Sequence, residues 1–512
     1  MNKNLLTRLF SIFLCIVFSV SVTVFLWVTK NGIGIGYDSF SYISTAERLL
    51  RGSSTFVNMT PHFPPMYTFM LALTGSFTGD VIASARWLHA FLYGANAVLI
   101  GVIIYYSTRK NLLASALGIL VFLTSRSVIS MQVYALSESL FFFFSLLTCL
   151  FFSVYIQLSK TRFLVLAALF AGMAVLTRYV GAALIPPLAI GILCLTRQTI
   201  RQKIKALITL AVFSVTPVAF WILRNILFFD SAANRMLVYH ARSVRRIASQ
   251  VIELFFPYIF GDMSASKYVQ RSAIALLALV VVLIIVFLLR KQIFSSQPDQ
   301  SGMAVFSMWL LFSVTYLLML VLSMNFFDAA TQMNDRILLP VYILFIPSMI
   351  SLLFIFSSHV SKIPVWPLIT VAILLSVWAG FPSWMKEIQT LHTDGIGFNS
   401  VLWNESPTLK RLKELPADTL VYSNGNSLIT LKTGLSTETL PKIYQSTTGI
   451  QNPRFEIQLD AICEEVRLGQ AVMVYLDQIG REYLPKEFEI QNQCHLPVLL
   501  DTKDGIIWGL PQ

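Results

Sequence analysis

Long apolar runs separated by short polar segments dominate this chain. The first run, Leu9 to Val28, is long enough to cross a bilayer, which takes about 20 apolar residues. It has no convincing small-residue cleavage site, so we predict a retained anchor. Ten further runs read as candidate spans, at roughly 81–106, 111–125, 136–157, 163–178, 180–196, 206–227, 272–290, 303–324, 337–357 and 364–383. The pattern therefore predicts a polytopic α-helical membrane protein with about eleven transmembrane helices.

Composition supports this fold class. Of 512 residues, 56% are hydrophobic and 12% are charged, whereas soluble domains carry about 25% charged residues. Too little polar surface remains for a water-soluble globule. The net charge of +12 is typical of lysine and arginine at a cytoplasmic membrane surface, and we expect no nucleic-acid partner.

Basic residues assign a side to each loop. If the spans are as predicted, the loops on the N-terminal side hold Arg109-Lys110, Lys160 with Arg162, Arg197 to Lys205, Arg290-Lys291 and Lys362. The positive-inside rule then places the N-terminus in the cytoplasm. An odd number of spans sends the first loop, residues 30–80, and the C-terminal tail to the outer side.

Three segments on the predicted outer side are polar. The first loop contains Asp38, Tyr42 and Thr45, which share one face of a short interfacial helix, and the apolar piece 64–78 is too short to span. The second segment, 228–271, holds an amphipathic helix with Arg242, Arg245 and Arg246 on one face. We therefore divide the chain into a transmembrane module, 1–383, and an outer domain, 384–512.

The outer tail reads as a small α/β domain. Strand-like runs occur at 419–422, 471–476 and 506–509, and Asp504-Gly505 is typical of a hairpin turn. Cys463 and Cys494 lie in this tail. They are a disulfide candidate if the tail is outside the cytoplasm, with two free thiols as the alternative.

Motifs of soluble enzymes are missing from the sequence: it contains no Walker A loop and no metal-type His or Cys spacing. Several looser patterns follow each other in order instead. They are Asp38-x3-Tyr42-x3-Ala46-x2-Leu49, His62-x-Pro64-Pro65-x-Tyr67, Leu136 to Leu140 with Glu138 in its centre, Thr177-Arg178-x-x-Gly181, and Arg336 to Pro340 opening a late span. Over residues 1–380 the chain thereby resembles the GT-C class of membrane glycosyltransferases. It is most similar to the branch of the protein O-mannosyltransferases, the lipid A aminoarabinose transferases and the Rgt-type bacterial enzymes.

The resemblance implies a function and a location. A sugar on a polyprenyl phosphate would pass to a lipid, glycan or protein acceptor on the outer face of a bacterial plasma membrane. Two positions depart from the family pattern: Ser39 stands where many members have Glu, and Phe63 stands where the aminoarabinose branch has Lys. These departures leave the sugar unassigned. No cofactor is implied with certainty, and a divalent metal is left open.

The same resemblance assigns roles to residues. Asp38 is the expected general base; Arg336, Arg178, His62 and Arg224 are the expected contacts of the donor phosphate; Tyr42 and Glu138 are supporting residues. Each has a simpler explanation. Asp38 and Glu138 also suit helix N-termini, Arg178 and Arg224 suit helix C-termini, and Tyr42 suits a membrane interface. Arg336 fits a structural role least, because it opens a span against the helix dipole.

Two other function classes remain. A transporter or flippase for lipid-linked glycans would share a basic path for the lipid phosphate, but it should show paired halves, and the sequence has no internal repeat. A non-catalytic membrane scaffold with a partner-binding outer domain would tolerate replacement of Asp38, His62 and Arg336 together.

Overall fold

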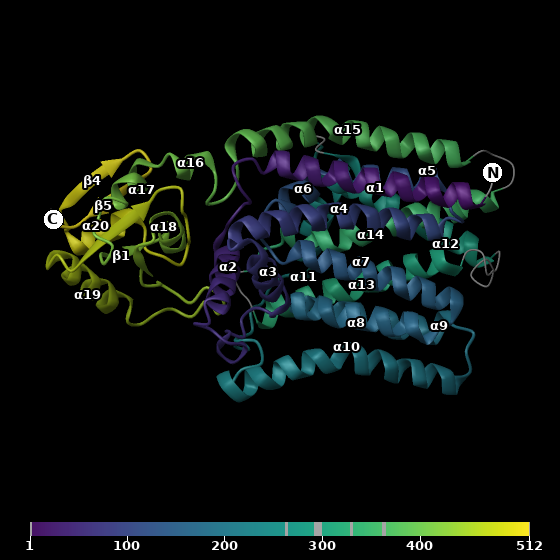
Figure 1. The fold of residues 1–512 in the computed structure, drawn as a ribbon, viewed down its shortest axis with the longest axis horizontal. Helices are drawn as coiled ribbons and strands as arrows, with labels where there is room; N and C mark the ends of the chain where they lie inside the picture. Colours follow the sequence, from purple (N-terminus) through teal and green to yellow (C-terminus); the bar gives the residue numbers. More distant parts are fainter. Residues whose placement is uncertain (1–2, 262–264, 291–299, 328–330, 361–364, 511–512) are drawn as a thin grey trace.

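Long helices run side by side along one axis of the molecule, and a small sheet domain lies at one end of them (Figure 1). The computed structural model describes residues 3–261, 265–290, 300–327, 331–360 and 365–510, so Lys291 and Lys362 of the predicted basic loops lie outside the described residues. Within these ranges, eight helices are long and apolar enough to cross a membrane. They are α1 (Lys3–Val28), α4 (Val81–Ser107), α7 (Glu138–Leu158), α10 (Ile200–Phe229), α12 (Lys267–Arg290), α13 (Gln300–Phe326), α14 (Asp335–His359) and α15 (Val365–Asp394).

Three of the predicted spans are shorter or bent. Helices α5 (Leu112–Leu123) and α6 (Arg126–Gln132) form a pair bent by 61° and count as a ninth span when taken together. Helix α8 (Thr161–Thr177) has 17 residues, and η2 (Tyr179–Leu184) leads into α9 (Ile185–Leu195) with 11. Each predicted span thus coincides with a helix. By length and composition, however, the described part of the chain has eight or nine spans and not the predicted eleven.

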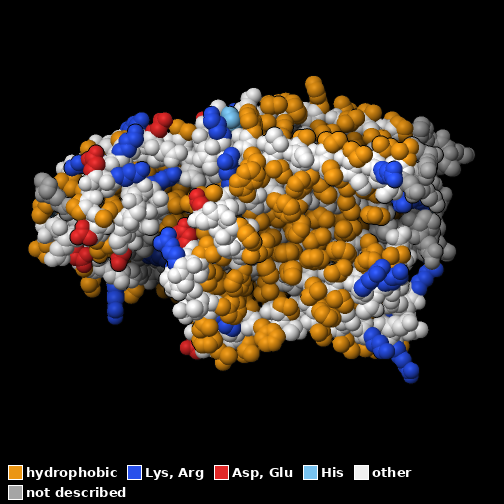
Figure 2. Space-filling view, viewed as in Figure 1, with side chains coloured by type: hydrophobic (Ala, Val, Ile, Leu, Met, Phe, Trp, Pro, Cys, Tyr) orange, Lys and Arg blue, Asp and Glu red, His pale blue; other side chains and the backbone are white. Residues whose placement is uncertain are grey.

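Small residues let the central helices approach closely. Helix α8 packs between α7 and α10, and its Ala168, Ala171 and Gly172 are buried. A Cβ atom added at Gly172 would lie 2.9 Å from the backbone oxygen of Ser214 on α10, so only glycine permits this contact. Large apolar side chains point outward instead, and Figure 2 shows them covering the middle of the bundle, with lysine and arginine gathered towards its two ends.

Short helices form a layer across one end of the bundle. Helix α2 (Tyr37–Leu50), η1 (Phe56–Asn58) and α3 (Met66–Thr78) lie between the spans and the C-terminal domain (Figure 1). Helix α11 (Val244–Phe260) overlaps the predicted amphipathic helix and packs against α12, α14 and α15. It begins after Arg242, so only Arg245 and Arg246 of the predicted basic face belong to it. Residues 262–264 of that segment lie outside the described ranges. The N-terminus and the C-terminal domain lie at opposite ends of the bundle.

The C-terminal domain is a five-stranded mixed sheet with helices. Its elements are α16 (Val401–Asn404), α17 (Pro407–Leu412), β1 (Leu420–Ser423), α18 (Asn426–Thr433), β2 (Ser436–Thr439), α19 (Phe455–Arg467), β3 (Ala471–Leu476), α20 (Glu487–Cys494), β4 (Val498–Thr502) and β5 (Gly505–Trp508). The strand order is β2-β1-β3-β5-β4; β1 pairs in parallel with β2 and β3, and β5 pairs antiparallel with β3 and β4. Cys463 and Cys494 form a disulfide between α19 and α20. Helix α15 continues through residues 384–394, past the predicted domain boundary.

Two backbone bridges hold the segment that leads into α2. The backbone of Gly34 pairs with Tyr134, and that of Ile35 pairs with Gly397 at the start of the C-terminal domain. Gly397 has a φ of +61°, and a Cβ atom there would lie 2.4 Å from the Ile35 oxygen, so the pairing requires glycine. The Arg481 guanidinium lies 3.3 Å from the centre of the Tyr37 ring. These contacts fix where Asp38 sits.

Candidate active site

Four charged side chains from distant parts of the sequence meet where the helix bundle faces the C-terminal domain. Asp38 lies in the first turn of α2, and Glu138 opens α7 after Ser137. Arg178 follows the last residue of α8. Arg336 is the second residue of α14, whose N-terminus is capped by the Asn334 side chain, which accepts from the Ile337 N–H at 3.2 Å. Each side chain is placed by a helix end, and the helix packing brings these ends together.

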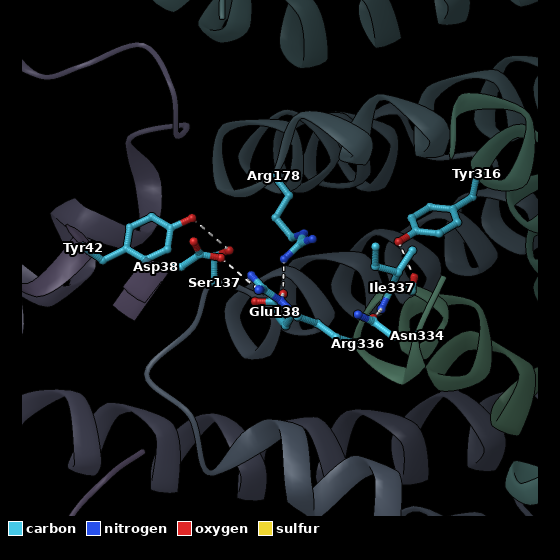
Figure 3. A network of polar contacts seen from close by, with 9 residues as sticks. All are labelled: Asp38, Tyr42, Ser137, Glu138, Arg178, Tyr316, Asn334, Arg336 and Ile337. Carbon is cyan, nitrogen blue, oxygen red and sulfur yellow. Dashed lines mark hydrogen bonds and ion pairs between the residues drawn. The ribbon is translucent and has the colours of Figure 1, made fainter. Parts of the chain in front are cut away.

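The four side chains form one chain of ion pairs (Figure 3). Glu138 Oε1 accepts from both Arg178 Nη1 and Arg336 Nε. Arg336 Nη1 also lies 2.9 Å from Asp38 Oδ2. Two arginines and two carboxylates therefore alternate as Arg178, Glu138, Arg336, Asp38. We call these four residues the charge cluster.

Burial changes along the charge cluster. The Glu138 side chain is only 2% exposed, whereas Arg178 is 20%, Arg336 31% and Asp38 38% exposed. A carboxylate as buried as Glu138 stays charged only when it is paired and hydrogen-bonded, and two guanidinium groups meet that need. The exposed end of the cluster is Asp38, so a reactant arriving from the surface meets this carboxylate and the arginines first.

The arginines keep donor capacity for an anion. A guanidinium has five N–H donors in a planar fork. The contacts within the charge cluster engage Nε and Nη1 of Arg336 and Nη1 of Arg178. A phosphate could therefore bind two partly exposed guanidinium groups in a bidentate manner while Glu138 still holds them.

Neighbouring tyrosines brace the charge cluster. The Tyr42 hydroxyl donates to Ser137 Oγ at 3.3 Å, next to Glu138, and burial raises the pKa of Tyr42, which keeps it a neutral donor. The Tyr316 hydroxyl donates to the Ile337 backbone oxygen at 2.6 Å, and that of Tyr258 donates to the Asp335 backbone oxygen at 3.0 Å. Ser137 belongs to the predicted motif Leu136 to Leu140 but has no role assigned to it. Tyr258 and Tyr316 are not predicted as site residues, because their local patterns are those of ordinary helix and span residues.

Two predicted phosphate contacts lie in other surroundings. Arg224 donates to the Val57 backbone oxygen at 2.6 Å and to Asn225 Oδ1 at 2.7 Å, and it stacks on Trp221. It thus fastens η1 to α10 and has no contact of this kind with the charge cluster. His62 lies edge-on to Phe63 and lines a cavity beside α2. Of the predicted set, the structure therefore brings Asp38, Glu138, Arg178 and Arg336 together, with Tyr42 next to them.

No group of three or more histidine, cysteine, aspartate or glutamate side chains gathers as a metal site within the described ranges. The two carboxylates of the charge cluster face guanidinium groups instead. The residues present are thus suited to hold an anion.

Comparisons with known proteins identify the fold. A family model described as dolichyl-phosphate-mannose-protein mannosyltransferase matches residues 62–221, which include Glu138 and Arg178. The structure of ArnT from Cupriavidus metallidurans in the apo state superposes over 98% of this chain and 99% of its own, with a TM-score of 0.60 at 11% identity. The chain has the GT-C fold. No curated protein matches it by sequence.

Two further structures share this GT-C fold. ArnT from the same organism bound to undecaprenyl phosphate aligns with 98% of the chain and 99% of its own, with a TM-score of 0.53 at 14% identity. The mycobacterial arabinofuranosyltransferase AftD aligns with 97% of the chain but 40% of its own length, with a TM-score of 0.51 at 12% identity. The predicted fold class, a multi-span helical membrane protein with a small C-terminal α/β domain, is confirmed.

Proposed function

We propose that this GT-C protein is a glycosyltransferase. It moves a sugar from a polyprenyl-phosphate donor to a lipid, glycan or protein acceptor on the outer side of the membrane. The observation that carries the proposal is the charge cluster: a partly exposed carboxylate, Asp38, lies 2.9 Å from Arg336, and a second arginine, Arg178, shares the buried Glu138 with it. A base and a pair of cations therefore stand next to each other, as transfer from a lipid phosphate requires.

The reaction follows from these positions. The acceptor hydroxyl gives its proton to the Asp38 carboxylate as its oxygen forms a bond to the anomeric carbon of the donor sugar. The bond from that carbon to the phosphate oxygen breaks, and the phosphate takes the electron pair. Arg336 and Arg178 hold the phosphate and stabilise the charge that it gains. A positioned base is worth about 10²–10⁴-fold, and fixed charge at a leaving group is of similar size.

Glu138 acts on the arginines and has no contact with the reactants. Its side chain is buried at the start of α7 and accepts from both guanidinium groups. It holds two like charges side by side before any phosphate arrives, so the site does not need to rearrange during the reaction. We therefore assign Glu138 as a positioning residue.

The end of the molecule that carries the C-terminal domain is the outer side in this proposal. Asp38 of the charge cluster belongs to α2, which lies next to that domain, and the N-terminus lies at the other end (Figure 1). With the N-terminus in the cytoplasm of a bacterium, the donor would be held at the outer leaflet of the plasma membrane. A disulfide in the C-terminal domain fits an oxidising compartment.

The test is a transfer assay in proteoliposomes with a panel of radiolabelled polyprenyl-phosphate sugars and membrane extract as a source of acceptor. We expect wild type to remove label from the lipid and Asp38→Asn to be at least 100-fold slower. The matched control is Asp230→Asn, an exposed aspartate at the end of α10 with a φ of +51°, where asparagine is well tolerated.

The outcomes separate the function classes. Equal turnover by Asp38→Asn and wild type would remove Asp38 as the base. Label that crosses the bilayer while still attached to its lipid would identify a transporter and overturn the proposed transferase.

A further inference from the structure

A cavity of about 330 Å³ lies beside α2 on the outer side of the bundle. Its walls come from α2, from the segment between η1 and α3, from Thr68 of α3, and from Ser427 at the start of α18 in the C-terminal domain. This volume lies in the range of small-molecule sites, about 300–1,000 Å³. The charge cluster does not line this cavity, whereas His62, which the sequence predicts as a phosphate contact, does.

The cavity adjoins the proposed base. Ser41 and Tyr42 line it and lie three and four residues after Asp38, so they share its face of α2 one helical turn away. In Figure 3, Tyr42 and Arg336 point towards Asp38 from opposite sides. Asp38 therefore stands between the arginines on one side and the cavity on the other.

The hydroxyl groups of the cavity offer acceptors. Ser41 Oγ donates to the Tyr37 backbone oxygen at 3.1 Å, and Ser44 Oγ and Thr45 Oγ1 donate to the Ser41 backbone oxygen at 3.3 and 2.7 Å. Because these hydrogens are committed to the helix backbone, the lone pairs of the Ser41 and Ser44 oxygens remain for donors in the cavity, whereas Thr45 Oγ1 already accepts one bond from Arg48. A ligand rich in hydroxyl groups would supply such donors.

The charged and aromatic side chains that line the cavity indicate which class of ligand it can bind. Arg48 Nη2 donates to Thr45 Oγ1 at 3.2 Å, which holds the guanidinium at the cavity, and no carboxylate belongs to the lining. Phe40, Tyr42 and Phe63 add aromatic faces, which pack well against the apolar faces of sugar rings. Hydroxyl acceptors, a cation and aromatic faces together suit a saccharide that carries an anionic group.

We infer that this cavity binds the acceptor and that the acceptor group is an anionic saccharide, with Ser427 of the C-terminal domain as part of the site. The inference rests on the proposed function and names its second substrate. Displacement at the anomeric carbon requires the attacking and leaving oxygens in line on opposite sides. With the phosphate on the arginines, the attacking hydroxyl approaches from the cavity side of Asp38.

The experiment is ligand-observed saturation-transfer NMR on the full chain in nanodiscs, with glucose 6-phosphate as the probe. Glucose and inorganic phosphate are the control ligands, since they carry the sugar and the phosphate group of the probe separately. We expect glucose 6-phosphate to bind more tightly than either half. Arg48→Gln should weaken it at least tenfold, and Ser427→Trp should abolish binding by filling the cavity from the domain side.

Two matched variants control for general damage. Arg51→Gln removes a charge from the end of the same helix, and Ser436→Trp adds the same bulk on the exposed edge strand β2; neither residue lines the cavity. Both should bind the probe as wild type does.

Several results would overturn the inference. They are no binding of glucose 6-phosphate, equal binding by all variants, and inorganic phosphate that binds as tightly as the sugar phosphate. Displacement of the probe by undecaprenyl phosphate would likewise assign the cavity to the donor. The assay needs no turnover, and Asp38→Asn should still bind the probe, so a failed transfer assay and a failed cavity assignment give different patterns.

Discussion

Replacing Glu138 by glutamine tests the centre of the charge cluster. The substitution keeps the shape of the side chain but removes a carboxylate that contacts both Arg178 and Arg336. Removing one partner of a fully buried ion pair costs about 3–5 kcal/mol. Because the arginines keep 20% and 31% exposure, water recovers part of this loss. We therefore expect a loss near the lower end, about 3 kcal/mol.

Membrane proteins often unfold irreversibly, so the assay is the rate of thermal inactivation in detergent at a fixed temperature. A loss of about 3 kcal/mol corresponds to an increase in rate of up to about 100-fold. The matched control is Glu387→Gln. Glu387 pairs with Arg126, which is 51% exposed, and an exposed pair of this kind contributes about 0–1 kcal/mol.

The double variant Glu138→Gln, Arg178→Gln sharpens the test. Removing a neighbouring cation together with the carboxylate should recover part of the lost stability, because less unpaired charge stays buried. Equal inactivation rates for Glu138→Gln and Glu387→Gln would refute the reasoning, since Glu138 would then carry no more stability than a surface carboxylate.

Three further predictions concern contacts outside the charge cluster. Arg224→Gln should lower the free energy of unfolding by about 1–2 kcal/mol, because the stacking on Trp221 and the hydrogen bond to the Val57 oxygen are lost. The inactivation rate measures this loss. The transfer assay should show donor turnover within about threefold of wild type. Loss of the disulfide by Cys463→Ser, across a sequence separation of 31, should destabilise the C-terminal domain by about 4 kcal/mol and expose it to limited proteolysis. Burial raises the pKa of Asp504, but hydrogen bonds from the hydroxyls of neighbouring serine and threonine side chains outweigh it and lower the pKa overall. Its stabilisation is therefore present above the ordinary Asp pKa of about 3.9 and is lost on acidification below it; Asp504→Asn should remove about 2 kcal/mol at pH 7 and flatten that acid loss in unfolding measurements.

Arg336 is predicted as a contact of the donor phosphate, because it opens a span against the helix dipole. The structure pairs Arg336 with Glu138 and Asp38, and its phosphate contact stays a prediction. Glu138 is predicted only as a supporting residue, because the helix dipole already explains an acid at a helix N-terminus. Its central place depends on how α7, α8 and α14 pack, and no local pattern carries that information.

The rest of the fold also divides into features that a local sequence pattern predicts and features that depend on packing. The predicted bounds of the apolar strands β1, β3 and β5 lie within one or two residues of the observed ones, because runs of apolar side chains indicate buried strands. Strand β2, Ser436–Thr439, contains no apolar residue and is a strand only because β1 pairs with it. The resemblance implies a phosphate contact for Arg224, and the simpler explanation is its place at a helix end. In the structure Arg224 contacts the Val57 backbone oxygen of η1, which fits the simpler explanation. Local chemistry showed that these residues need partners, and the packing of the helices decides which partners they meet.

The balance of charge in the cluster explains how one site can serve both stability and transfer. Two arginines and two carboxylates sum to zero, so the cluster is stable without a ligand, and an arriving phosphate adds negative charge to it. The cheapest contact to release is the most exposed one, between Arg336 and Asp38, since Glu138 is buried against both arginines. Binding of the phosphate would therefore draw Arg336 away from Asp38 and free this carboxylate at the moment when a base is needed. On this argument the donor would activate the proposed base, and Asp38 stays paired with Arg336 until the donor arrives.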